Sequence, residues 1–158
     1  MKKGLRHIAL ALVCALTAIF VSGCGVRKIK DISVTSAGVK YIVPTSSRSM
    51  DAVLLLGLDN PSITFTVSDV EGAIRYYDRV LATFTAGELP VQGKSVQVYE
   101  LPCTATLDDG VSLLDLLVIA SKKSLDGMTA DVRLHAKLRN GMGTTLNFND
   151  IDLSQFTQ

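Results

Sequence analysis

The chain has 158 residues, 47% of them hydrophobic and 20% charged, and a formal net charge of +1. This length fits one domain with a sizeable hydrophobic core. The near-neutral charge argues against a nucleic-acid partner, because proteins that bind nucleic acids present clustered basic residues to the phosphates.

The first 23 residues have the layout of an export signal. Lys2, Lys3 and Arg6 give a basic start, and residues 8–21 that follow carry no charge. Such an uncharged run suits the apolar core of a signal peptide and is too short for a comfortable membrane span. The sequence therefore predicts a signal peptide over residues 1–23.

This signal ends in Val21-Ser22-Gly23-Cys24. The four residues resemble a bacterial lipobox, whose cysteine receives a diacylglycerol thioether and becomes the new N-terminus. The resemblance implies a lipid anchor on Cys24. One acyl chain holds a protein only marginally, at about 0.8 kcal/mol per buried CH₂, but a lipobox cysteine carries more than one. The alternative is an ordinary secretory signal followed by a chance cysteine.

Processing at Cys24 divides the chain into the signal, a lipid-anchored tether over residues 24–30 and a folded domain over residues 31–158. The signal carries three basic residues and no acidic one, so the mature chain keeps 13 basic and 15 acidic residues and a net charge of −2. Cys14 leaves with the signal and Cys24 carries lipid. Cys103 then has no cysteine partner, so we expect no disulfide within the chain.

The domain begins with two predicted strands. Residues 31–43 are rich in β-branched and aromatic side chains, and residues 50–58 are apolar on both faces, which is typical of a central strand. The second strand ends at Asn60-Pro61, because proline cannot donate a hydrogen bond to a sheet.

A change of alternation marks the next strand. Ile63, Phe65 and Val67 are apolar at odd positions, whereas Val70 starts an apolar series at even positions. A period of two changes phase only through an irregularity, so we expect a bulge or bend at Ser68-Asp69. The later expectations are a turn at residues 77–79, a returning strand at 80–86, a loop at 87–94 and a long strand at 96–107.

The long strand places Cys103 on one face with Leu101 and Ala105, which predicts a small buried side chain. The alternative is a reactive thiol, which needs a nearby base or helix N-terminus to lower its pKa. The sequence places neither beside it.

One helix is predicted over residues 111–123, followed by strands at 130–139 and 144–150. The helix has one apolar face and acidic residues before it that suit an N-terminal cap. That face comprises Leu113, Leu114, Leu117 and Ala120, and the candidate caps are Asp108 and Asp109. These elements predict a mainly β fold: an Ig-like antiparallel β-sandwich of about seven strands with one α-helix.

The order of these elements resembles the domain of type-two late embryogenesis abundant proteins, also called the water-stress and hypersensitive-response (WHy) domain. Residues 54–61 read Leu-Leu-Leu-Gly-Leu-Asp-Asn-Pro, where the family has an apolar strand closed by Asn-Pro, and residues 72–82 resemble its hairpin. The family often has Asn-Gly at the turn, where this chain has Asp78-Arg79. The resemblance implies a small β-sandwich without a general catalytic site, associated with stress protection and with membrane, protein or lipid contacts.

The chemistry-bearing residues do not form a catalytic pattern. His135 lies on an outward strand face between Arg133 and Lys137, and alternation puts it on the opposite side from Cys103. This basic stripe is expected to be a solvated face that blocks edge pairing. The oxygen-rich residues 147–152 lack the glycine and the final glutamate of a calcium loop, and no zinc spacing is present. We expect no enzyme activity, no cofactor and no metal.

Three function classes follow from these observations. The first is a membrane-anchored envelope lipoprotein, monomeric in its domain, with a non-catalytic binding or protective role and an envelope protein or lipid as partner. The second is a carrier of a small apolar or lipid ligand between the sheets. The third is a hydrolase with an unrecognised site. The expected location is the periplasmic side of the outer membrane, with the lipid on Cys24 as the anchor.

Overall fold

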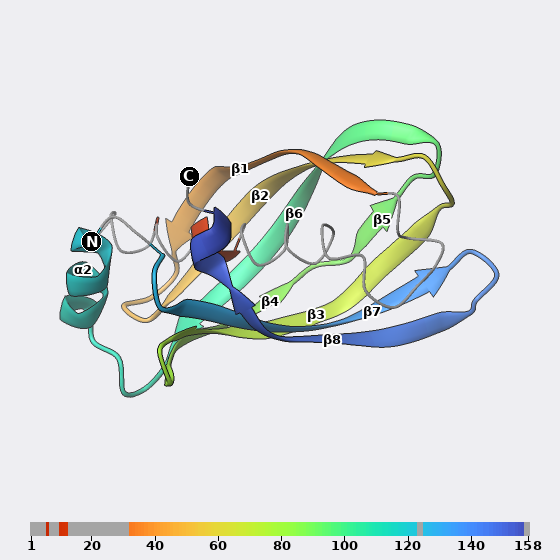
Figure 1. Ribbon diagram of the computed structural model, residues 1–158. Coiled ribbons are helices and arrows are strands. Elements are labelled where there is room, and N and C mark those ends of the chain that lie inside the picture. Colours follow the sequence, from red (N-terminus) through yellow and green to blue (C-terminus); the bar gives the residue numbers. More distant parts are fainter. Residues whose placement is uncertain (1–5, 7–9, 13–31, 123–124, 157–158) are drawn as a thin grey trace.

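The computed structural model describes residues 6, 10–12, 32–122 and 125–156, and strands dominate it (Figure 1). None of the described helices is long and apolar enough to cross a membrane. The elements in chain order are β1 (Ser33–Pro44), β2 (Ser49–Asn60), β3 (Phe65–Tyr76), β4 (Arg79–Ala86), β5 (Leu89–Val91), β6 (Ser95–Leu107), α2 (Leu113–Ser121), β7 (Met128–Leu138), β8 (Gly143–Asp152) and the 3₁₀ helix η1 (Leu153–Phe156).

The strands form one antiparallel sheet in the order β1-β2-β6-β4-β3-β7-β8, and β5 pairs with β3. Figure 1 shows the sheet bending over, with β1, β2 and β6 in one layer and β3, β7 and β8 in the other. Strand β6 joins the layers, because it pairs with β2 along its length and with β4 through residues 103–107. The predicted mainly β sandwich with one helix is confirmed, with both layers belonging to one continuous sheet.

Strand β2 has hydrogen-bonded neighbours on both sides, as its two apolar faces predict. Its even-numbered side chains from Met50 to Leu58 are buried. The strand closes at Asn60, which is 1% exposed. Its amide donates to the carbonyls of Ile63 and Gln92 at 2.8 and 3.1 Å, and its side-chain oxygen accepts from the Ser62 N–H at 3.0 Å. Asn60 thus links the loop after β2 to the loop after β5 by hydrogen bonds, and the polar atoms of its buried side chain all have partners.

The predicted bulge in β3 is confirmed. The pairing of β3 with β7 shifts register between Ser68 and Glu71, and Asp69 has a φ of 51°. The following turn is one residue shorter than predicted, since Tyr76 pairs with Arg79. Tyr77 there has a φ of 52° and donates its N–H to the Gly127 carbonyl at 2.7 Å.

Helix α2 differs from its prediction in its cap and in one buried position. Ser112 is the cap: its hydroxyl accepts from the Asp115 N–H at 3.2 Å, and the Asp115 carboxylate accepts from the Ser112 N–H at 2.9 Å. Asp108 is used in the preceding turn, where its carbonyl accepts from the Val111 N–H. Leu114 is 73% exposed, so the expectation that it faces inward is wrong.

Two further expectations are corrected by strand pairing. Strand β7 lies between β3 and β8, so its basic stripe cannot block edge pairing, and the edge strands are β1 and β8. The loop expected at 87–94 contains the short strand β5, which pairs with the first part of β3. Both pairings are contacts between distant segments, which alternation within one segment does not reveal.

Candidate functional site

The outer face of the sheet is hollowed across β6, β4, β3, β7 and β8. A hollow of about 490 Å³ lies there. A second hollow adjoins it, shares Glu71, Thr85 and Arg133 with it, and extends to the bulge of β3 and to His135. We call the two together the outer groove. The first hollow is lined by Glu71, Gly72, Ala73, Thr83, Phe84, Thr85, Thr104, Thr106, Asp131, Val132, Arg133, Asn147 and Asn149.

Threonines form a regular array in the groove. Thr83 pairs with Thr106 and Thr85 pairs with Thr104, so two Thr-x-Thr segments lie side by side on β4 and β6. Neighbouring strands are about 4.8 Å apart, which sets the spacing of the hydroxyls across the pair. The Thr104 hydroxyl also donates to the Asp51 carboxylate at 2.8 Å. This array offers donors and acceptors to a polar ligand.

Charged side chains on β3, β7 and β8 pair across one side of the groove. Arg133 lies 3.4 Å from Glu71, and Arg75 pairs with Asp131 and, at 3.1 Å, with Asp150. Asp131 also accepts from the Asp150 N–H at 2.9 Å. These contacts neutralise the charges among themselves. The second hollow is also lined by Asp69 and Glu88, so acidic side chains outnumber basic ones in the outer groove.

The predicted candidates for nucleophile and base lie on opposite faces. His135 is half-buried on the outer face, with its Nδ1 3.4 Å from the Thr145 hydroxyl. Cys103 is buried on the inner face, as predicted, and burial raises the pKa of its thiol to about 12. A raised pKa keeps the sulfur as a poor nucleophile at neutral pH. The two side chains are not placed to act as a pair.

The oxygen-rich run at 147–152 does not converge on one point. Asn147 and Asn149 line the outer groove, and Asp150 pairs with Arg75. Asp152 accepts from the N–H and hydroxyl of Ser154, and these bonds lower the pKa of its carboxyl. Among the residues that the structure describes, no group of three histidine, cysteine or acidic side chains is placed to hold a metal ion.

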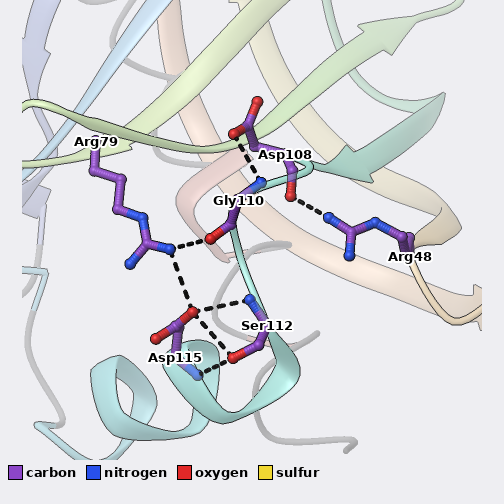
Figure 2. A network of polar contacts seen from close by, with 6 residues as sticks. All are labelled: Arg48, Arg79, Asp108, Gly110, Ser112 and Asp115. Atoms are coloured by element: carbon purple, nitrogen blue, oxygen red, sulfur yellow. Dashed lines mark hydrogen bonds and ion pairs between the residues drawn. The ribbon is translucent and has the colours of Figure 1, made fainter.

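A second polar cluster lies at the start of helix α2 (Figure 2). Arg79 donates to the Gly110 carbonyl and lies 3.4 Å from Asp115, while Arg48 donates to the Asp108 carbonyl. The Ser112 N–H, the Ser112 hydroxyl and Arg79 lower the pKa of the Asp115 carboxyl. Both arginines are thus engaged in fixing the segment before the helix, which makes this cluster a structural one.

The predicted lipid-attachment residue, Cys24, lies outside the described residues. The described part of the preceding segment is Arg6 and residues 10–12. Ala11 and Leu12 have no exposed surface and belong to the same buried cluster as the inward side chains of the sheet. The sequence analysis predicted neither the burial of Ala11 and Leu12 nor the threonine array of the outer groove. The two Thr-x-Thr segments were the signal for the array.

Comparisons with known proteins assign no family. No protein-family model and no curated protein matches the chain. Among solved structures, a protein from Archaeoglobus fulgidus is similar over 74% of this chain and 97% of its own, at 10% identity and a TM-score of 0.44. The archaellum periplasmic stator protein FlaG from Sulfolobus acidocaldarius is similar over 72% of this chain and 98% of its own, at 15% identity and a TM-score of 0.25.

Proposed function

We propose that this chain is a lipid-anchored protein of the cell envelope whose β domain binds a partner and does not catalyse a reaction. The observation that carries the proposal is the sequence Val21-Ser22-Gly23-Cys24 after a basic start and an uncharged run. These features together are the layout of a lipoprotein signal. The finer location is the periplasmic side of the outer membrane, since residues 25–30 lack acidic residues of the kind that accompany surface export in some bacteria.

The tether keeps the domain close to the membrane. Ile32 is buried in the domain core and lies eight residues after Cys24. At about 3.3–3.6 Å per residue, this segment spans at most about 29 Å. A partner of the domain is therefore a molecule within reach of the membrane surface, such as an envelope protein or a lipid.

Binding is supported by the chemistry of the outer groove. Its hydroxyl and amide side chains hydrogen-bond without transferring protons at neutral pH, and three of its charged residues, Glu71, Asp131 and Arg133, are already in ion pairs. A general base needs a partner that orients it, and His135 contacts only a threonine hydroxyl among its described hydrogen bonds. The resemblance to the WHy domain agrees with a non-catalytic role.

The anchor is tested by replacing Cys24 and, as a matched control, the signal cysteine Cys14. Cells growing with labelled palmitate are expected to label the parent and Cys14→Ala, and both proteins should sediment with membranes. Cys24→Ala should remain unlabelled as a signal-bearing precursor. Palmitate that still enters the Cys24 variant would show that the lipid-attachment assignment is wrong.

A further inference from the structure

The chain enters the folded domain at one end of the sandwich, where several loops gather. Ser33 at the start of β1 pairs with Asp59 near the end of β2. The loop after β5 lies beside them, because the Asn60 amide donates to the Gln92 carbonyl. The β7–β8 hairpin adjoins this loop, because the end of β7 pairs with the start of β3, which also pairs with β5. Figure 1 shows this hairpin and α2 at opposite ends of the domain. We call the start of β1, together with the loops at 61–64, 92–94 and 139–142, the tether end.

The tether end carries the basic side chains that are free to bind a partner. Lys94, Lys137 and Arg139 are exposed, and within the described part of the chain their side chains have no hydrogen bond or ion pair. The other described basic side chains of the domain each contact a carboxylate, a carbonyl or a phenol oxygen; they are Lys40, Arg48, Arg75, Arg79, Lys122 and Arg133. The described acidic residue at the tether end is Asp59. Positive charge therefore exceeds negative charge there.

The opposite end of the domain is acidic. It holds the β3–β4 turn, the segment before α2, α2 itself and the segment before β7. The acidic residues of these segments are Asp78, Asp108, Asp109, Asp115 and Asp126. A charge difference between two ends orients a molecule in the field of a charged surface. An anionic surface therefore attracts the tether end and repels the end that holds α2.

The tip of the β7–β8 hairpin presents an apolar side chain beside the basic ones. Met142 is 66% exposed, and its backbone is held in place. Its carbonyl accepts from the Leu138 N–H at 2.6 Å, and its N–H donates to the Asn140 side chain at 3.0 Å. Val96, the second residue of β6, is also 66% exposed. Exposed apolar side chains next to basic ones are typical of surfaces that lie at the headgroup layer of a membrane.

We propose that the tether end of the mature domain docks on the anionic headgroups of the membrane that holds its anchor. Lys94, Lys137 and Arg139 contact the headgroups, and Met142 enters the boundary of the acyl chains. The proposal rests on the function proposed above, since the anchor keeps the domain within about 29 Å of the bilayer. It deepens that function by giving the domain an orientation: α2 points away from the membrane, and the outer groove, on a side face of the sandwich, stays open to a partner.

The test uses the acylated mature protein, purified in detergent and reconstituted into vesicles of phosphatidylcholine alone or mixed equally with phosphatidylglycerol. Met142→Cys is labelled with an iodoacetamide of the fluorophore NBD, whose lifetime lengthens in apolar surroundings. Cys103 is buried and the sulfur of Cys24 carries lipid, so the introduced thiol takes the label. Leu114→Cys is the matched control, because Leu114 is 73% exposed at the opposite end. A long-lifetime component is expected for the Met142 label on the anionic vesicles and for neither label on the neutral ones.

Neutralising the charges of the hairpin should undock the domain. Lys137→Gln combined with Arg139→Gln should lower the docked-to-free ratio of the Met142 label by about 25-fold, because each basic side chain near an anionic surface contributes a factor of about five. Ser47→Glu combined with Leu114→Glu is the charge control, since it changes the net charge equally at exposed positions of the opposite end. It should leave the ratio within about twofold, because charges beyond the Debye length of about 10 Å in 0.1 M salt are largely screened.

Flotation with neutral vesicles reports the anchor separately from docking. A protein that floats with neutral vesicles but gives the same Met142 lifetimes in both lipid mixtures keeps its anchor and overturns the docking. Docking is also overturned if the Leu114 label responds equally or if both double variants lower the ratio equally. A Met142 label that responds to soluble polyphosphate over neutral vesicles marks a site for a soluble polyanion, which contradicts lipid docking. A protein that carries no acyl chain and does not float contradicts the proposed function, and the docking proposal fails with it.

Discussion

Replacing Asn60 with alanine tests the role of the Asn-Pro motif at the end of β2. The side chain is 1% exposed and makes three hydrogen bonds of 2.8–3.1 Å to the backbone of two loops. A typical intramolecular hydrogen bond contributes about 0.5–1.5 kcal/mol net, so Asn60→Ala is expected to lower the free energy of unfolding by about 3 kcal/mol. This is a large share of the roughly 5–15 kcal/mol of an ordinary domain.

Urea unfolding followed by far-UV circular dichroism measures the loss. Because small proteins lose about 1–3 kcal/mol per M urea, the midpoint should fall by roughly 1–3 M with an unchanged slope. Asn140→Ala is the control: Asn140 is exposed and accepts one hydrogen bond, from the Met142 N–H at 3.0 Å. The reasoning is refuted if the two variants shift the midpoint equally.

The remaining predictions concern two buried positions and one on the outer face. Leu56→Ala, in the buried row of β2, should cost about 2–5 kcal/mol and deplete the protein in cells, whereas Leu55→Ala on the outer face should cost clearly less. His135→Ala should change stability by about 0.5 kcal/mol or less and leave any cellular phenotype intact; loss of function in a stable variant would point to catalysis. Cys103 should react with a bulky thiol reagent only on unfolding. Because its folded pKa is raised from 9.0 to about 12, its contribution to stability is complete below pH 9 and should fall by about 1.4 kcal/mol per pH unit above it, a slope that Cys103→Ala removes.

The features predicted well are those that a single segment determines. Alternation places Leu101, Cys103 and Ala105 together, and all three are buried. The change of phase after Val67 predicts the bulge, because the same strand must keep an apolar side chain toward the core on both sides of Ser68-Asp69. Such rules need no knowledge of which strands become neighbours.

The features that were missed depend on partners far away in the chain. Residues 83–85 and 104–106 form one array only because β4 pairs with β6. The cap of α2 shows the same limit locally: Asp108, Asp109 and Ser112 all suit a cap by residue type. The choice of Ser112 follows from Asp115, which bonds back to it, and from the use of Asp108 in the preceding turn.

Strands β3 and β4 contribute to both the outer groove and the core, because successive side chains of a strand point to opposite faces of the sheet. On β4, Phe84 is buried in the core between Thr83 and Thr85, which line the outer groove. Gly72 on β3 permits this packing, since a Cβ there would lie 2.6 Å from the Phe84 ring and 2.3 Å from the Asp131 carbonyl. A substitution at an outward position therefore changes the polar groove while the inward side chains of the same strand stay in the core. Binding at the outer groove can accordingly be tested with outward substitutions that leave the core intact.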